Sequence, residues 1–147
     1  MIELTSRKEE EFPVPAQKLW DAVSDFGAVE DFWPPGMLTK VEIKGEGVGM
    51  VRSIHTVIGI VLHEKLDSID HDSKTLTLTI VGDLPAGMEG YHAKGSVTPS
   101  GDDACTLAWE GHYSVPDADS EAGARQFIEG AYGAMFNGLR DFVTKEG

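Results

Sequence analysis

The sequence contains one cysteine, few basic residues and no long apolar run, and each shortage argues against a class of protein. Cys105 is the single cysteine among 147 residues, so no disulfide can form within the chain. Small secreted domains commonly rely on several disulfides. We therefore expect a protein of the cytoplasm, with Cys105 as a structural thiol on a strand.

Basic residues are scarce relative to acidic ones. Lys and Arg number 12 against 25 Asp and Glu, which gives a formal net charge of −13. Affinity for nucleic acid rests mainly on Lys and Arg that neutralise phosphates, so we expect no general binding of DNA or RNA. The excess of negative charge is consistent with a device for solubility.

No apolar run is long enough to cross a membrane. The longest, from Val57 to Leu62, is interrupted by Gly59, whereas a spanning helix needs about 20 apolar residues. The first residues are charged from Glu3 onward and lack the apolar core of a signal peptide. The sequence also lacks repeats and linkers, so we expect residues 1–147 to form one cytoplasmic domain.

The first part of the chain combines one strand with two short helices. A charged strand is predicted over residues 3–12, and two prolines follow it. Apolar residues at helical spacing then predict a helix over 16–24. A second short helix, over 28–32, must end before Pro34, because a residue that precedes proline avoids the helical conformation.

From Leu38 onward apolar and polar residues alternate, which is typical of half-buried strands. Strands are predicted at residues 38–44, 50–57, 60–70, 74–81, 89–99 and 104–115. Their connections are short and rich in Gly, Asp and Pro, so neighbouring strands are expected to pair antiparallel in a meander.

The last part of the chain returns to helical spacing. Ser120 is the expected N-cap of a long helix, and a stripe of apolar residues follows it. Gly130, Gly133 and Gly138 interrupt this helix, and each costs about 1 kcal/mol relative to alanine. Close approach to the sheet or room for a ligand would explain these glycines, and so would chance.

This order of elements, together with three segments, carries a resemblance to a known family. The segments are Pro15–Phe26 (PAQKLWDAVSDF), Gly47–Arg52 (GVGMVR) and Glu64–Asp70 (EKLDSID). Over essentially its whole length the chain resembles the START/SRPBCC superfamily, which has the birch-pollen-allergen or helix-grip fold, and within it the polyketide cyclase/dehydrase-like branch. The resemblance implies an α+β fold in which a curved antiparallel sheet of about seven strands wraps around the long C-terminal helix and encloses a cavity. It does not select a function, because the superfamily includes carriers, receptors, cyclases, dehydratases and isomerases.

Glu64 is the most informative residue of the predicted strand 60–70. Its face also carries Ile60, Leu62 and Leu66, so the carboxylate lies on the side of the strand that should be buried. A buried carboxylate needs a partner, because desolvating its charge costs several kcal/mol.

Arg52 is the expected partner of Glu64. The two residues are equally distant from the turn at Ile58–Gly59, so a hairpin that closes there places them directly opposite each other. Members of the resembled superfamily carry an arginine and a glutamate in these two strands, and in some plant members these residues bind or act on the ligand. The resemblance implies the same here, with Arg52 gripping a carbonyl or carboxylate and Glu64 orienting it or moving a proton. An ion pair at the rim of the sheet, without any such role, would explain the same two residues.

Alternation along the strands and the helical stripe also select candidate walls of the cavity. The residues expected to contact a ligand are Ile54, Leu62, Leu78, Tyr91, Trp109, Tyr113, Tyr132 and Met135. Buried phenol and indole groups usually need a hydrogen-bond partner. A ligand can supply that partner, and so can ordinary core packing.

Two loop residues complete the candidate site. Trp33 lies in the proline-rich corner 32–36, and Met88 ends the segment 84–88, which resembles a gate loop. In the resembled fold both segments lie near one end of the cavity, so we expect Trp33 and Met88 to contact the ligand. Tight turns that carry hydrophobic plugs are the alternative.

Five histidines raise the question of a metal site. His55 with His63, and His92 with His112, are expected to share the outer faces of two strand pairs. No helical His spacing, carboxylate triad or cysteine cluster accompanies them in the sequence. We therefore predict no metal and no cofactor.

Two functions fit these observations, and a third remains open. The chain is expected to bind a small, mostly apolar molecule, such as a lipid, polyketide or isoprenoid, in an internal cavity. Alternatively it is an enzyme of the cyclase or dehydratase kind, in which Glu64 is the general acid or base and Arg52 polarises a carbonyl. The third function is that of a module whose acidic surface docks a basic protein. The sequence selects neither the ligand nor the oligomeric state.

Overall fold

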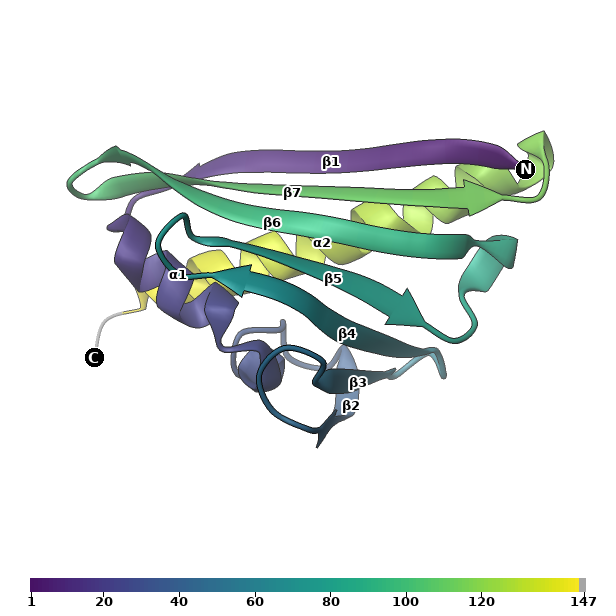
Figure 1. Cartoon of the computed structure of the whole chain (residues 1–147), viewed down its shortest axis with the longest axis horizontal. Coiled ribbons are helices and arrows are strands. Elements are labelled where there is room, and N and C mark those ends of the chain that lie inside the picture. The colour runs from purple at the N-terminus through teal and green to yellow at the C-terminus, as the bar shows by residue number, and fades with distance from the viewer. Residues whose placement is uncertain (146–147) are drawn as a thin grey trace.

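A computed structural model describes residues 1–145 of the chain. Its elements, in chain order, are β1 (Ile2–Phe12), α1 (Ala16–Ser24), the short helix η1 (Phe26–Asp31), β2 (Leu38–Lys44), β3 (Val51–Thr56), β4 (Val61–Asp70), β5 (Thr75–Val81), the turn η2 (Pro85–Gly87), β6 (Glu89–Gly101), β7 (Ala104–Val115), the turn η3 (Ala118–Ser120) and α2 (Glu121–Thr144). The strands form one seven-stranded sheet in the order β1-β7-β6-β5-β4-β3-β2. Figure 1 shows this sheet with α2 lying along one of its faces.

The sheet is an antiparallel meander with one exception. Strands β2 to β6 each pair with the next strand in sequence, whereas β1 pairs with β7 and forms one edge. Register shifts between Leu66 and Ser68 in β4, and near both ends of β6, interrupt the regular pairing. Such bulges bend a strand and increase its twist, which lets the sheet curve around α2.

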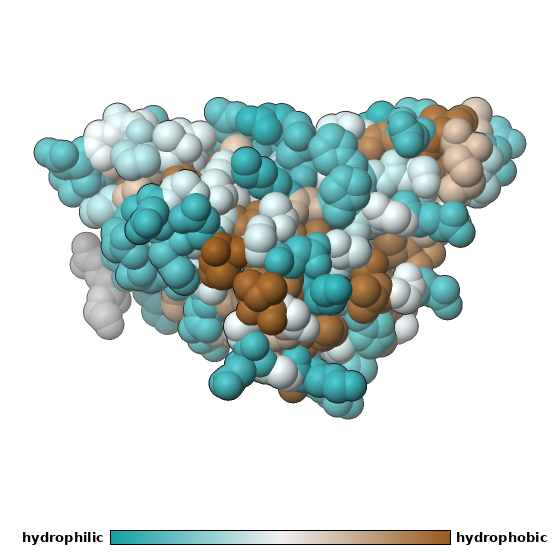
Figure 2. Space-filling view, in the orientation of Figure 1, coloured by the Kyte–Doolittle hydropathy of each residue, from teal (hydrophilic) through white to brown (hydrophobic). Residues whose placement is uncertain are grey.

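The two faces of the sheet differ in polarity. Along β7, buried and half-buried residues alternate from Ala104 to Val115, as expected for a strand that is covered on one face. Figure 2 shows the outward face, where hydrophilic side chains surround a smaller number of apolar ones. The inward face packs against α2 and supplies most of the core.

Helix α1 covers one end of the sheet because one of its faces is apolar. Leu19, Trp20 and Val23 are buried at helical spacing along that face. The Trp20 indole N–H donates to Nδ1 of His71 at 3.1 Å. This bond connects α1 to the turn between β4 and β5.

Helix α2 is held against edge strand β1 by two arginines. Arg125 donates from Nη1 to the Thr5 carbonyl at 3.0 Å. Arg140 donates from Nη1 to the Glu11 carbonyl at 3.1 Å and from Nη2 to Glu10 at 2.7 Å. These bonds use backbone carbonyls that an edge strand leaves unpaired, so they fix the position of α2 along the sheet.

One of the three glycines within α2 has a clear packing reason. A Cβ atom at Gly138 would lie 2.0 Å from the carbonyl oxygen of Phe32, so only glycine allows the chain after η1 to approach the helix. A Cβ atom at Gly130 or Gly133 would meet no atom within 4 Å. Close packing therefore explains Gly138 but not the other two.

Most predicted elements are confirmed, and two details are wrong. The helix predicted over residues 16–24 is α1, and every predicted strand lies within two residues of an observed one at each end. The second short helix spans Phe26–Asp31 instead of 28–32 and is a 3₁₀ helix with a kink at Ala28. Ser120 is the N-cap residue of α2, as predicted, but its side chain makes no capping bond; Asp117 caps the preceding turn η3 and accepts from the Ser120 N–H at 2.9 Å. Among residues 1–145, no helix is long and apolar enough to cross a membrane.

Candidate functional site

A cavity lies between the inward face of the sheet and α2. It is lined by Trp33, Arg52, Ile54, Leu62, Glu64, Ile80, Tyr91, Trp109, Phe127, Ile128, Ala131, Tyr132 and Met135. Its volume is about 40 Å³, enough for water but well below the roughly 300–1,000 Å³ of typical ligand pockets. A ligand of more than a few atoms therefore requires movement of the side chains or of α2.

Arg52 and Glu64 form an ion pair in the wall of this cavity. They are register partners on β3 and β4, as their equal distance from the turn predicts. Nε of Arg52 donates to Oε1 of Glu64 at 2.7 Å, and the two side chains are 6% and 14% exposed. The pair therefore belongs to the buried face and does not lie at an exposed rim.

The guanidinium of Arg52 is held from a second side by η1. Nη1 donates to the Phe26 carbonyl at 3.1 Å, and the guanidinium carbon lies 3.8 Å from the centre of the Phe26 ring. A cation over an aromatic face is stabilised by the quadrupole of the ring. These contacts fix the orientation of Arg52 without using all of its N–H groups.

Two polar atoms of this ion pair remain available to a ligand. Among residues 1–145, Nη2 of Arg52 and Oε2 of Glu64 make no hydrogen bond, and no side-chain polar atom is both buried and without a partner. Both atoms are therefore accessible, and both residues line the cavity. The wall thus offers one donor and one acceptor side by side.

A pair of phenols forms a second polar group in the cavity. The hydroxyl oxygens of Tyr91 and Tyr132 lie 2.6 Å apart, and the two residues are 3% and 4% exposed. Burial raises the pKa of both phenols well above the usual value, and the negative charge of Glu64 raises both pKa values further. The two tyrosines therefore remain neutral at physiological pH.

Two strand glycines make room for the aromatic residues of the cavity. A Cβ atom at Gly111 would lie 2.1 Å from the Tyr132 hydroxyl oxygen, and one at Gly95 would lie 2.3 Å from the Trp109 ring. Real Cβ atoms do not approach other atoms so closely, so an alanine at either position would displace the aromatic side chain. The two glycines therefore help to position the side chains of Tyr132 and Trp109.

The structure brings most of the predicted site residues together. Those that line the cavity are Trp33, Arg52, Ile54, Leu62, Glu64, Tyr91, Trp109, Tyr132 and Met135. Leu78, Met88 and Tyr113 are buried but lie outside the lining, so their contact with a ligand stays a prediction. The Tyr113 hydroxyl instead bonds Ser6 at 2.7 Å.

Sequence reasoning did not single out four residues of the lining. They are Ile80, Phe127, Ile128 and Ala131. Ile80 continues the alternation of β5. Ile128 and Ala131 lie one helical turn before Tyr132 and Met135 respectively, and Phe127 lies one turn before Ala131. The helical stripe includes these positions, but its spacing alone does not show which part of the stripe faces the cavity.

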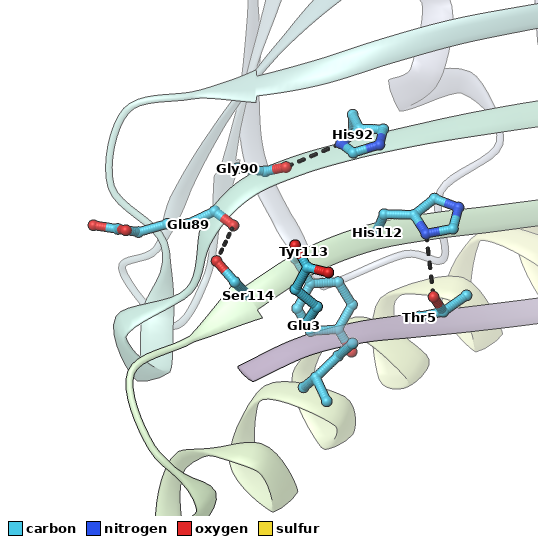
Figure 3. A pocket seen from close by; sticks show the side chains of 9 residues that line it. Glu3, Thr5, Glu89, Gly90, His92, His112, Tyr113 and Ser114 are labelled. Atoms are coloured by element: carbon cyan, nitrogen blue, oxygen red, sulfur yellow. Dashed lines mark hydrogen bonds between the residues drawn. The ribbon is translucent and has the colours of Figure 1, made fainter. Parts of the chain in front are cut away.

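A larger and more open groove lies over β1, β7 and β6 (Figure 3). Its volume is about 660 Å³, and its polar lining includes Glu3, Glu89, His92 and His112. The two imidazole rings stack with their centres 5.3 Å apart, which confirms that they share a face. Within residues 1–145 no group of three or more His, Cys, Asp or Glu could hold a metal ion, and this groove is more open to solvent than the cavity is.

Comparison with known proteins gives a family and a fold. The sequence model of the family described as polyketide cyclase / dehydrase and lipid transport matches residues 3–143. No curated protein matches the chain in sequence.

Solved structures of three other proteins share the fold over nearly their whole length. Norcoclaurine synthase from Thalictrum flavum, in complex with dopamine and hydroxybenzaldehyde, has a TM-score of 0.83 and 22% identity over 99% of this chain and 90% of its own. A protein from Thermobifida fusca has a TM-score of 0.80 and 23% identity, with coverage of 95% and 92%. XoxI from Bacillus cereus has a TM-score of 0.78 and 18% identity, with coverage of 99% and 97%. At these identities the likeness concerns the fold alone.

Proposed function

We infer that this chain, which belongs to the polyketide cyclase/dehydrase and lipid transport family, binds a small, mostly apolar molecule in the cavity beneath α2. The family description and the helix-grip fold support ligand binding in general. The apolar lining supports a ligand that is mostly hydrocarbon or aromatic. We expect the whole chain to act as one ligand-binding domain.

The observation that carries this proposal is the position of the Arg52–Glu64 pair. Its charges are largely buried in a mostly apolar wall, although well-packed apolar residues in place of such a pair often give equal or greater stability. Stability alone therefore does not account for the pair. Its accessible atoms, Nη2 of Arg52 and Oε2 of Glu64, supply the polar anchor that orients a ligand in an apolar pocket.

Native mass spectrometry of the protein purified from its own host tests this proposal, because it detects a bound molecule directly. We expect one small molecule per chain, which extraction then identifies as predominantly apolar. A protein that carries no such molecule, and that binds no member of a panel of fatty acids and aromatic ketones in solution, would contradict the proposal.

A second candidate function is enzymatic, and one observation favours it. The Glu64 carboxylate lies in the same cavity as two neutral phenols, so a base and potential acids surround the same space. A substrate with an acidic C–H group or a hydroxyl leaving group is the kind on which such residues act. Arg52 is then the group that polarises the carbonyl oxygen.

A Glu64→Gln variant distinguishes binding from catalysis, because glutamine keeps the shape and an acceptor oxygen but does not move protons. For a carrier we expect a loss of affinity of at most about tenfold. For an enzyme we expect turnover to fall by about 10²–10⁴-fold while the substrate still binds. Calorimetry measures the first quantity, and mass spectrometry of the product measures the second. If neither changes, Glu64 is not part of the anchor.

A further inference from the structure

The two edge strands of the sheet differ in how the rest of the chain covers them. Carbonyl groups of β1 accept hydrogen bonds from Arg125 and Arg140 of α2. The opposite edge is β2, which pairs with β3 alone and lies at the far side of the sheet from β1 (Figure 1). The free edge of a sheet is a template for a further strand, so β2 can accept one along its seven residues.

Hydrogen bonds at the end of β3 show which backbone groups of β2 face this free edge. The Thr56 N–H donates to the Ile60 carbonyl on the side of β4, and the next residue, Val57, donates to the Met37 carbonyl on the side of β2, both at 3.0 Å or close to it. Successive residues of an antiparallel strand bond alternately to its two neighbours. The odd-numbered residues of β3 therefore bond to β2, and their register partners there are the even-numbered residues from Lys40 to Lys44.

Val41 and Ile43 consequently direct their backbone N–H and C=O groups away from β3, to the free edge. Within residues 1–145 no loop or cap backbone bonds these groups. Both side chains lie on the inward face of the sheet, because their register partners, Ile54 and Arg52, are buried there. Ile43 is nevertheless 44% exposed. The edge thus presents unpaired backbone groups together with apolar surface.

The charges on the outward face of β2 are complementary about Val41, the middle residue of the strand. A two-fold axis at Val41 places a second copy antiparallel, so that Lys40 of each copy faces Glu42 of the other. Both side chains are 60% exposed. Oε1 of Glu42 lies 2.5 Å from His55 and 3.8 Å from Lys40 of its own chain, whereas Oε2 forms no ion pair among residues 1–145. This oxygen is available to a lysine of a second copy.

Other two-fold arrangements of β2 lack this complementarity. An axis at Glu42 places that residue against itself and Lys40 against Lys44, and an axis at Lys40 places two lysines face to face. An axis at Ile43 requires residues beyond the end of the strand at Lys44. Lysines on an edge strand usually discourage pairing, so the charges of β2 favour one arrangement and oppose the others.

We propose that β2 pairs with β2 of a second copy of this chain, antiparallel about Val41, and joins the two seven-stranded sheets into one. The backbone groups of the two Val41 residues bond each other, and Ile43 of each copy packs beside Val41 of the other. The interface is small, so the dimer is weak and depends on concentration. It does not depend on which molecule the cavity binds.

Sedimentation equilibrium of the full chain in about 0.15 M sodium chloride measures the association, because salt at this level screens the repulsion between two acidic copies. We expect a dissociation constant of roughly 0.1 mM, so that the chain is mostly monomeric at about 10 µM and mostly dimeric at about 1 mM. Hydrogen exchange then locates the interface. The amides of Val41 and Ile43 should exchange several-fold more slowly at the higher concentration.

Charge reversals test the arrangement of the two strands. Glu42→Lys places lysine against lysine at both ion pairs, so we expect the dissociation constant to rise at least about tenfold. Lys40→Glu should weaken the dimer similarly. An equimolar mixture of the two variants should form a heterodimer about as tight as the wild-type dimer, because each variant carries the charge that the other lacks.

Glu9→Lys is the matched control. It makes the same change of charge at an exposed position of β1, the edge strand that α2 covers, and it lowers the net negative charge as much as Glu42→Lys does. Its dissociation constant should stay within about twofold of that of the wild type. A dimer that Glu42→Lys does not weaken would overturn the proposal, because another surface would then hold it together. A monomer at 1 mM would overturn it as well and leave the edge to a strand of a different protein.

Discussion

At the scale of single residues, the Arg52–Glu64 pair depends on the presence of both charges. Each side chain is largely desolvated, and the attraction between them offsets a desolvation cost of several kcal/mol per ion. Removing one partner leaves the other buried without compensation. Removing both leaves a wall of uncharged side chains, which is a different and milder change.

We expect Arg52→Met to lower the free energy of unfolding by about 3–5 kcal/mol, because it leaves Glu64 buried and unpaired. The double variant Arg52→Met/Glu64→Gln should recover most of this loss. Urea denaturation followed by tryptophan fluorescence gives both values. Arg7→Met is the control, since Arg7 pairs with Glu9 at the surface with side chains 50% and 52% exposed, and its effect should stay below about 1 kcal/mol. A double variant as unstable as Arg52→Met would contradict this account.

A contact in the site could be predicted from the sequence only where a local rule, such as strand register, determines which residues meet. The Arg52–Glu64 contact follows from strand register, because equal spacing from one turn decides which residues face each other. The 2.6 Å contact of Tyr91 with Tyr132 joins a strand to a helix far along the chain. No local sequence rule predicts this distance between the two hydroxyl groups. Nor does any local rule predict that the missing side chain of Gly111 leaves space for the Tyr132 hydroxyl.

At the scale of elements, the attachment of α2 to β1 contains a pH-dependent contact. The Glu10 carboxylate lies between Lys8 and Arg140, at 2.9 Å and 2.7 Å respectively. The hydrogen bond from Lys8, and then that from Arg140, lower the pKa of Glu10 below its usual 4.5. A carboxylate with a lowered pKa stabilises the folded state above its unfolded pKa, and this contribution is lost as the pH falls through the folded value.

We therefore expect Glu10→Gln to be less stable than the wild type at neutral pH, by less than about 1 kcal/mol because the pair is partly exposed. The difference should shrink as the pH falls below 4.5 and vanish once the pH is well below the lowered pKa of Glu10. Thermal unfolding of both proteins across this range measures it. Glu3→Gln serves as control, since Glu3 forms no ion pair among residues 1–145. A difference that grows at acid pH would refute the assigned role.

Elements were predictable to the extent that their hydrophobic period was clear. The alternation of apolar and polar residues predicted the strands, and the stripe of apolar residues at helical spacing predicted α2. The 3₁₀ form of η1 was not predictable, because six residues carry too little periodicity to distinguish one helix type from another. Nor was the turn η3, which Asp117 caps directly before the predicted N-cap residue Ser120.

At the scale of the whole molecule, a net charge of −13 on 147 residues destabilises the folded state. Like charges repel one another more strongly in the folded chain than in the expanded one. Salt screens this repulsion over about 10 Å at 0.1 M.

We expect the melting temperature to rise by a few degrees when sodium chloride is raised from about 0.02 M to about 0.5 M. Differential scanning calorimetry measures the change. A variant with Asp102→Asn and Asp103→Asn removes two negative charges from the turn between β6 and β7, so salt should raise its melting temperature less. A melting temperature that falls with salt would show that attractive ion pairs outweigh the net repulsion.

The volume of the cavity has a consequence for how strongly any ligand is held. With about 40 Å³ available, a molecule the size of a substituted benzene enters only a minor, opened conformation. The measured dissociation constant then equals the intrinsic one divided by the fraction of open molecules, so an open population of about 1% weakens binding about a hundredfold. The side chains that line the space, Trp109 and Met135 among them, therefore affect affinity through the open fraction as well as through direct contact, and a substitution that raises the open fraction should tighten binding by conformational preorganisation.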